Sequence, residues 1–418
     1  MTHPLPDATI AALYEREWAR VLGTITHLTR DLELAEDATQ DAFIAAIDSW
    51  PQSGIPTQPV AWLIATAKRK AIDRLRRQTT LQRKLPLLIV PDTTHDDDPT
   101  DGDDVIPDET LRLIFTCCHP ALAPDARVAL TLRLITGIPT ADIATLFLVS
   151  EPTMAARLTR AKRKIQIAGI PYRVPPKAEM PARLPAVLQV IFLLFTNGHG
   201  ARRGPEFVRP THIHHAERLA RMLVALLPDD AEATALLALI VLAEARRPAR
   251  HDADGELILL PDQDRRRWNH ALIAEGLART RRALVLSAGD PGPYALEAAI
   301  AALHTEASSY DATDWEQVVS LYNMMMDRAP SPLIALSRAV ALGERDGPAV
   351  MLTEVDRLAD DPALHAYAAL HIARGDALAG LGRVTEASVA FEAALATSQN
   401  AQEIRSIQRR LARLPRSS

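Results

Sequence analysis

The segment TADIATLFLVSEPTMAARLTRAKRKI, residues 140–165, predicts two short helices joined by a turn. Thr140 can cap a first helix over 141–147, and Ser150 can cap a second helix that starts one residue later, because both hydroxyls can accept a bond from a free backbone N–H group. Pro152 is tolerated there, since its missing N–H would have no partner in the first turn of a helix. The segment is therefore typical of a helix-turn-helix.

The second helix of this segment separates apolar from basic side chains. Its apolar residues recur every three or four positions and are expected to face a core: Met154, Leu158, Ala161 and Ile165. The outward positions are Thr153, Ala156, Arg157, Arg160 and Lys164. A recognition helix in a DNA major groove has this layout, with its first residues near base edges and later cations on phosphates. An ordinary helical hairpin is the alternative, but the basic run without an acid favours nucleic acid.

A second pattern, DLELAEDATQDAF at residues 31–43, predicts a helix with an acidic face. The acidic and amide side chains fall three or four positions apart, opposite a row of alanines: Glu33, Glu36, Asp37, Gln40 and Asp41. Such a face suits a basic protein partner rather than DNA. A solvated helix face is the alternative interpretation.

A third pattern, PVAWLIATAKRKAIDRLRR at residues 59–77, predicts a helix with a basic face. The expected buried positions are Leu63, Ala67, Ala71 and Leu75, while Lys70, Arg74 and Arg77 follow another face and can track phosphates. Trp62 leaves two interpretations open. It can offer a surface on which a base stacks, or it can anchor the core.

Composition places these patterns in a large helical chain. The 418 residues are 48% hydrophobic and 4% aromatic, with 47 Lys and Arg against 52 Asp and Glu and a net charge of −5. Few aromatics and many Ala, Leu and Arg residues favour helices, so we expect an all-α fold of two or three domains. The two cysteines are adjacent, a geometry that rarely permits a disulfide, so a disulfide-bonded secreted fold is not expected. No apolar run is long enough to cross a membrane. We therefore expect a cytoplasmic protein with no membrane partner.

The charges are unevenly distributed along the chain. Residues 92–109 hold nine acids and no Lys or Arg, among Pro91, Pro99 and Pro107, which predicts a linker. Basic blocks over 68–84 and 157–173 flank this linker, as expected of two modules that face a polyanion. A second proline-rich stretch predicts a domain boundary near 175–182.

The chain beyond this boundary predicts successive helices, with a short extended piece at 256–260. The clearest expected helices are 184–195, 213–227, 231–245, 268–286, 294–308 and 315–329. Gly375, Ala387, Phe391 and Ala394 have the spacing of the packing positions in a tetratricopeptide helix pair. We expect a stack of helical hairpins, with a helical domain without repeats as the alternative.

Taken together, these patterns resemble those of an extracytoplasmic-function (ECF) sigma factor, a specificity subunit of bacterial RNA polymerase. LAEDATQDAF at 34–43 resembles sigma region 2.2, residues 59–77 resemble regions 2.3 and 2.4, and residues 125–165 resemble region 4. The resemblance implies four parts, which are region 2 at 8–84, an acidic flexible linker at 85–107, region 4 at 108–170 and a tetratricopeptide-like extension at 182–418.

The resemblance also implies partners and contact residues. Core RNA polymerase would bind through its β′ coiled coil to region 2, at Glu36, Asp37, Gln40, Asp41 and Phe43, and through its β flap to region 4. The −10 promoter element would contact Trp62, Lys68, Arg69, Lys70, Arg74, Arg76 and Arg77. The −35 element would contact Ser150, Thr153, Ala156, Arg157, Arg160 and Lys164. The family directs promoter-specific transcription initiation.

The downstream half resembles a sigma-factor subgroup with a helical extension. The resembling segments are 192–198, 257–265, Trp268, 292–301 and 330–332, whereas the loop at 196–200 departs from the acidic version such proteins tend to have. We expect the extension to modulate activity, either by restraining the sigma domains in cis or by binding a regulatory protein, because stacked hairpins present concave surfaces.

Two rival functions stay open at this stage. One is a stand-alone helix-turn-helix regulator whose helical domain senses a ligand or partner. The other is a metal-dependent enzyme or sensor built on His199, His212, His214 and His215. The CCH run at 117–119 lacks the second ligand pair of a zinc site, and no catalytic motif occurs, so we expect no enzyme, metal or cofactor.

Overall fold

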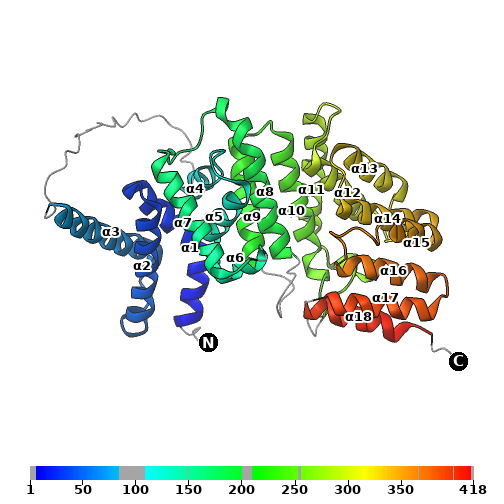
Figure 1. The fold of residues 1–418 in the computed structure, drawn as a ribbon. Coiled ribbons are helices and arrows are strands. Elements are labelled where there is room, and N and C mark those ends of the chain that lie inside the picture. Colours follow the sequence, from blue (N-terminus) through cyan, green and yellow to red (C-terminus); the bar gives the residue numbers. More distant parts are fainter. Residues whose placement is uncertain are drawn as a thin grey trace. The chain divides into compact units, whose positions relative to one another are not determined.

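A computed structural model describes residues 6–83, 109–147, 149–199, 210–252, 256–365, 367–398 and 400–415. These residues form α-helices and short 3-10 helices with one isolated bridge between His251 and Leu257, and they contain no β-strand (Figure 1). The expected all-α class is confirmed. The chain divides into two compact units, Met1–Val190 and Ile191–Ser418. In the described part of the chain, no helix combines the length and apolar character needed to cross a membrane.

The first unit begins with a three-helix module, called the first module below. Its helices are α1 (Pro6–Thr29), α2 (Leu32–Ser53) and α3 (Pro59–Arg83), and each packs on the other two. Trp18 and Phe43 are buried, with ring centroids 6.1 Å apart, and Trp50 is buried near the C-terminal end of α2. Apolar residues every three or four positions line these contacts, so burial of one face of each helix holds the module together.

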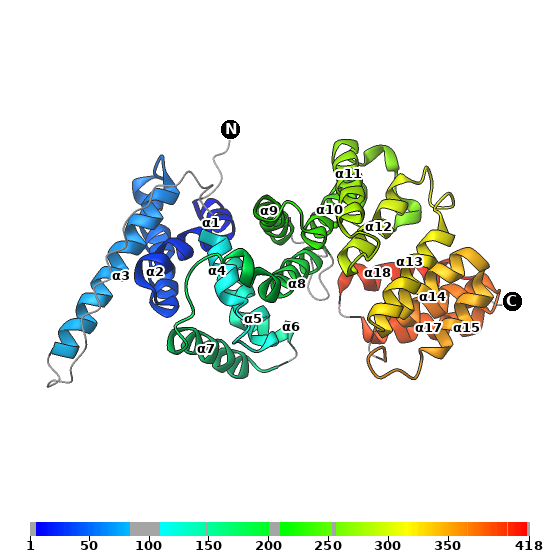
Figure 2. The same ribbon diagram turned by 90° about the horizontal axis from the view of Figure 1, so that it is seen from above.

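A second module follows in the same unit. Its helices are α4 (Glu109–Cys117), α5 (Pro124–Thr136), α6 (Thr140–Leu146) and α7 (Glu151–Ile167), and the short 3-10 helix η1 (Lys177–Glu179) leads into α8 (Met180–His199), which crosses into the second unit. Figure 2 shows α4 beside α1, and α5 also contacts α1, so the two modules are packed together. The predicted linker at 85–107 lies outside the described residues.

The second unit is a succession of helices in which each α-helix from α10 onward contacts the next one in the chain. Its helices are α9 (Pro210–Leu226), α10 (Ala231–Arg246), α11 (His270–Leu286), α12 (Pro293–Glu306), α13 (Trp315–Arg328), α14 (Pro332–Asp346), α15 (Pro348–Arg357), α16 (Ala368–Gly380), α17 (Val384–Thr397) and α18 (Ala401–Arg413). The short 3-10 helices are η2 (Arg247–Ala249), η3 (Leu260–Asp262) and η4 (Arg265–Arg267). All six expected helices occur within a few residues of their predicted limits. Assignment to the tetratricopeptide class stays a prediction.

Glycines set the close approach of the helices in two successive pairs. A Cβ atom on Gly375 of α16 would lie 2.5 Å from Cε1 of Phe391 on α17, and one on Gly343 of α14 would collide with the Met351 side chain on α15. Ala387 and Ala394 are fully buried beside Phe391. The predicted packing positions therefore meet in one core, where small residues make room for one large side chain.

Replacing Phe391 by alanine is expected to lower the free energy of unfolding by about 3–5 kcal/mol, because the buried ring leaves a cavity. Urea denaturation of the full chain, followed by circular dichroism, measures the change. Val389→Ala on the same helix is the control: its side chain is 60% exposed, so its effect should stay within about 0.5 kcal/mol. Equal effects of both changes would contradict the assigned core.

Cys117 and Cys118 lie fully buried between α4 and α5. Burial raises the pKa of Cys118 to about 12, opposed by the Thr131 hydroxyl, and raises the pKa of Cys117 as well. Both thiols therefore stay protonated at neutral pH, and a protonated thiol is a poor nucleophile.

We expect both thiols of the native chain to react with a chromogenic disulfide reagent at pH 8 at least about tenfold more slowly than in the denatured chain. Absorbance of the released thiolate gives both rates. A rapidly reacting thiol in the native protein would show that this core opens readily.

Candidate nucleic-acid and polymerase interface

Helix α2 carries the predicted acidic face and begins at a side-chain cap. The Asp31 carboxylate accepts bonds from the backbone N–H groups of Glu33 at 2.9 Å and Leu34 at 3.0 Å, which fixes where the helix starts. Asp37 is exposed, and Gln40 and Asp41 are half-buried. These three predicted polymerase contacts therefore form one accessible surface.

The two other predicted polymerase contacts are buried. Phe43 is 3% exposed and packs edge-on against Tyr14, so it acts as a core residue of the first module. Glu36 is 4% exposed and faces the second module. The burial of these two side chains was not predicted from the pattern at 31–43. The signal available was spacing: Glu36 stands three and seven positions before the buried Thr39 and Phe43, as residues of one buried helix face do.

Two apolar side chains extend the accessible surface of α2. Ile44 is 55% exposed and Ile47 is 50% exposed, and they follow Gln40 by four and seven positions. Exposed isoleucines beside an acidic surface are typical of a protein interface. The charge pattern of this segment gives no indication of them.

Helix α3 presents its basic side chains largely as predicted. Lys68, Arg69, Lys70, Arg76 and Arg77 are exposed, and Leu63, Ala67 and Ala71 are buried. The prediction for Leu75 is wrong, because it is 38% exposed beyond the end of the packed face. Trp62 is half-buried, edge-on to Trp50 with ring centroids 5.3 Å apart.

Arg74 joins the basic and acidic surfaces of the first module. Its guanidinium binds Asp37 at 2.6 Å and Asp41 at 2.9 Å. All three side chains are partly exposed, so solvent and salt weaken these pairs. A polar hollow of about 390 Å³ between α2 and α3 is lined by Asp31, Glu33, Leu34, Asp37, Arg74 and Arg77. One predicted DNA contact is thus bound to two predicted polymerase contacts.

The helix-turn-helix has the predicted second helix. Ser150 caps α7, accepting a bond from the Thr153 N–H group at 3.4 Å, and its hydroxyl lies 2.8 Å from the Thr153 hydroxyl. Met154, Leu158, Ala161 and Ile165 are buried, and the exposed residues are Ser150, Thr153, Ala156, Arg160 and Lys164. The first helix begins at Thr140, so Thr140 belongs to α6 and does not cap it.

Arg157 is the least accessible of the predicted −35 contacts. It pairs with Asp125 at 3.5 Å and lies 5.7 Å above the centre of the Phe147 ring. Its side chain is 25% exposed. These contacts hold the Arg157 guanidinium against segments that precede α7.

Glu36 connects the two modules. Its carboxylate accepts a bond from Nε of Arg133 on α5 at 2.7 Å and a second from Nζ of Lys162 on α7. Arg133 also donates to the carbonyl oxygen of Ile138. The side chains of Arg133 and Lys162 are 14% and 17% exposed, so the three charges are largely removed from water.

Two tyrosines add contacts between the modules. Tyr172 donates to the carbonyl oxygens of Gly23 on α1 at 3.0 Å and Glu109 on α4 at 2.9 Å, and burial raises its pKa. Tyr14 on α1 donates to the carbonyl oxygen of Gly137, which ends α5, at 3.3 Å. Neither tyrosine was singled out in the sequence.

The predicted metal candidates do not assemble in the described part of the chain. There, no group of three or more His, Cys, Asp or Glu side chains is placed to hold a metal ion. His214 is exposed and His215 is buried on α9, while the side chains of His199 and His212 fall outside the described ones.

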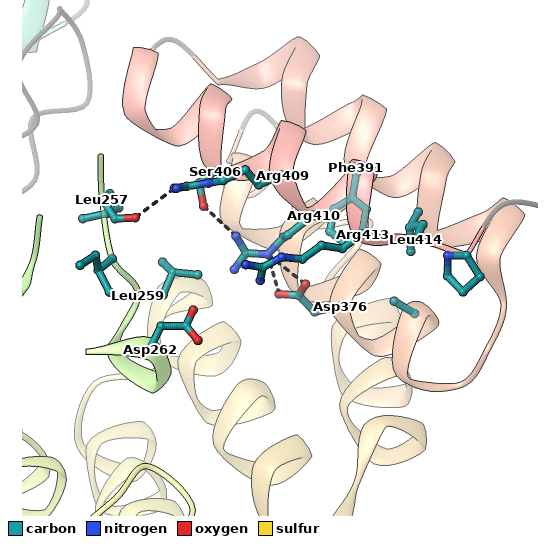
Figure 3. Close-up of a pocket in the computed structure, with 13 residues that line it drawn as sticks. Leu257, Leu259, Asp262, Asp376, Phe391, Ser406, Arg409, Arg410, Arg413 and Leu414 are labelled. Atoms are coloured by element: carbon teal, nitrogen blue, oxygen red, sulfur yellow. Dashed lines mark hydrogen bonds and ion pairs between the residues drawn. The ribbon is translucent and has the colours of Figure 1, made fainter. Parts of the chain in front are cut away.

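The extension contains a cleft of about 680 Å³ (Figure 3). The segment from Leu257 to Asp262 faces helices α16 and α18 across it. Arg410 binds Asp376 at 3.0 Å and the Ser406 hydroxyl at 2.9 Å, and Arg409 donates to the Leu257 carbonyl oxygen. The apolar lining includes Leu257, Leu259, Ala379, Phe391, Leu414 and Pro415.

Family comparisons cover three parts of the chain. Residues 13–80 match sigma-70 region 2, residues 112–165 match sigma-70 region 4, and residues 183–284 match a family of unknown function. The predicted limits of regions 2 and 4 enclose the first two ranges. No solved structure matches the chain.

Relatives match over much of their length. An uncharacterized protein of Rhizobium meliloti (strain 1021) is 40% identical over 92% of this chain and 90% of its own length. The ECF RNA polymerase sigma factor SigK of Mycolicibacterium vanbaalenii is 30% identical over 37% of this chain and 80% of its own. Probable ECF RNA polymerase sigma factor SigI of Mycobacterium tuberculosis (strain H37Rv) is 27% identical over 52% of this chain and 80% of its own. Together with both sigma-70 regions in their order, these matches show that the chain belongs to the ECF sigma factors and carries a C-terminal extension.

Proposed function

We propose that this sigma factor reads both promoter elements, with α3 on the −10 element and α7 on the −35 element, and that its extension modulates transcription. Its two sigma-70 regions make core RNA polymerase and promoter DNA its partners. The observation that carries the promoter proposal is the division of α7, which buries four apolar residues and exposes a face of hydroxyl, alanine and basic side chains.

The exposed face of α7 suits the major groove. Ser150, Thr153 and Ala156 stand at the start of the helix, where side chains reach base edges, and Arg160 and Lys164 follow where phosphates lie. Arg157, held by Asp125, would have to leave that carboxylate to bind DNA.

Helix α3 suits a melted −10 strand. The side chains of Lys68, Arg69, Lys70, Arg76 and Arg77 are exposed. Arg76 and Arg77 stand two turns beyond Arg69 and Lys70, so the same sides of the helix stay cationic and can track phosphates. Trp62 is half-buried against Trp50, so it anchors this helix while keeping part of its ring accessible. Stacking of a base on that part is the finer proposal.

The accessible surface of α2 suits the polymerase. Asp37, Gln40 and Asp41 supply acceptors and negative charge, and Ile44 and Ile47 supply apolar area. A basic helical partner such as the β′ coiled coil complements this surface, and region 4 would bind the β flap. Glu36 and Phe43 are buried and would contribute indirectly or after rearrangement.

Asp37→Arg/Asp41→Arg is expected to weaken binding to core polymerase at least about tenfold, because like charges then oppose the basic partner and Arg74 loses both carboxylates. Fluorescence anisotropy with purified core polymerase measures affinity, and run-off transcription from a promoter library measures initiation.

Asp327→Arg/Asp360→Arg makes the same charge change on exposed residues of the extension and serves as the control. Unchanged polymerase binding by the Asp37→Arg/Asp41→Arg chain would contradict the α2 surface. Tight, sequence-specific DNA binding without polymerase would instead support a stand-alone regulator.

The extension's cleft suits an acidic, partly apolar segment of a regulatory protein. Arg409, Arg410 and Arg413 line it with Asp262 and Asp376 as the only acids among its lining residues. Arg413 is exposed, with no hydrogen bond or ion pair to any described side chain, so its charge is available to a partner. Neighbouring Leu414 and Pro415 add apolar surface.

Arg413→Glu is expected to change transcription from the cognate promoter in cells at least about twofold, because it reverses the charge that the partner would meet. The same variant should match wild type with purified polymerase, where no regulatory protein is present. Gln408→Glu, which adds one negative charge at an exposed position of α18 outside the cleft, is the control. Unchanged transcription in cells would contradict the partner site, and a change with purified polymerase would indicate action in cis.

A further inference from the structure

Three segments of the extension meet at the C-terminal end of helix α10, and we call this place the α10 junction. The backbone N–H group of Asn269 donates to the carbonyl oxygen of Ala245 at 2.8 Å. The 3-10 helix η4, which begins at Arg265, packs on η2, which directly follows Arg246 at the end of α10. Helix α12 packs on α10 (Figure 2), and its His304 carbonyl oxygen accepts a bond from Nη1 of Arg265 at 2.8 Å. Side chains from α10, η4 and α12 therefore converge.

Several polar atoms of the α10 junction are buried and bind no residue that the structure describes. They are Nη2 of Arg265, Nδ1 of His304 and Nε1 of Trp268. The Arg265 guanidinium lies 4.4 Å from the centre of the Trp268 ring, so the guanidinium and the indole are neighbours. Because buried polar atoms in proteins are normally hydrogen-bonded, these atoms point to a bound group that accepts from them.

The α10 junction is also short of negative charge. Arg246 and Arg265 form no ion pair with any described carboxylate, and Glu244, two residues before Arg246, binds Arg247 at 3.0 Å. The C-terminal ends of α10 and α12 supply about half a negative charge each, which leaves about one positive charge. Burial and the charge of Arg265 lower the pKa of Arg246 to about 10. Burial, Arg246 and Arg265 lower the pKa of His304 to about 4, so its ring is neutral at pH 7.

The donors of the α10 junction suit a phosphate group. A guanidinium binds an oxyanion through two parallel N–H groups, and here guanidinium groups come from two segments. A phosphate offers three acceptor oxygens that point in different directions and carries a charge of about −1.5 to −2 at pH 7, whereas a carboxylate has two oxygens in one plane. Arg246, Arg265 and His304 are half-buried, so a small anion can reach them.

We propose that the α10 junction binds a phosphate group, either as inorganic phosphate or as part of a small phosphate monoester. Arg246 and Arg265 bind the phosphate oxygens, and Trp268 and His304 add N–H donors. An anion that binds only the folded state stabilises the extension in proportion to its occupancy. The extension thereby gains a small-molecule ligand, independently of whether α3 and α7 read promoter DNA.

Binding to the full chain is measured by isothermal titration calorimetry in phosphate-free buffer, with inorganic phosphate and, separately, with glycerol 3-phosphate. We expect the wild type to bind at least one of them with a dissociation constant below about 1 mM. Arg246→Met removes one cation and keeps an unbranched apolar side chain, and it should weaken binding at least about tenfold. Arg357→Met makes the same charge change on a side chain of α15 that is 68% exposed, and it is the matched control.

Thermal unfolding separates a binding role of Arg246 from a structural one. Without phosphate, Arg246→Met should melt at least as high as the wild type, because it removes repulsion from Arg265. An arginine that only held the fold together would lower the melting temperature when replaced. Inorganic phosphate or glycerol 3-phosphate, whichever binds more tightly, should raise the wild-type melting temperature by at least about 3 °C at about 10 mM and leave Arg246→Met unchanged.

No binding of either phosphate compound by the folded wild type would overturn the site and would leave water as the partner of the buried donors. Equal binding by the wild type and Arg246→Met would place the anion elsewhere and would also overturn it. Tighter binding of succinate than of both phosphate compounds would overturn the phosphate class. Tighter binding of inorganic phosphate or of glycerol 3-phosphate would support the site and show which form of phosphate it prefers.

Discussion

The pairing of Glu36 with Arg133 and Lys162 determines how the sigma regions are arranged, because it places one carboxylate from region 2 among cations of region 4. Buried ion pairs add little net stability, since desolvation offsets most of their attraction. Such a cluster disfavours packings of these surfaces that would leave one of the three charges buried without a partner. Apolar burial folds each region, and this small polar cluster specifies which faces meet.

Periodicity was sufficient to predict the helices and the inward residues of α7. Met154, Leu158, Ala161 and Ile165 are buried as expected because local helix geometry decides their direction. Phe391 and its glycine and alanine neighbours were found for the same reason, since helix pairs join residues close in sequence.

Contacts between distant segments could not be predicted in this way. The partners of Glu36 stand 97 and 126 positions away, and those of Arg74 stand 37 and 33 away. A charged side chain at a helical surface looks the same in sequence whether water or another module covers it. The prediction for Leu75 was wrong in the opposite direction, because it was expected to be buried and is exposed. Its spacing matches the buried face, but α3 extends beyond the surface on which that face packs.

The position of Arg74 between Asp37 and Asp41 has a thermodynamic consequence for the order of assembly. Under the proposed function, a basic protein that binds the two aspartates releases the Arg74 guanidinium on the helix proposed to face the −10 strand. DNA that takes up the guanidinium likewise releases two carboxylates to the polymerase. In this proposal each ligand removes a competitor of the other, and linkage would then raise both affinities by the same factor.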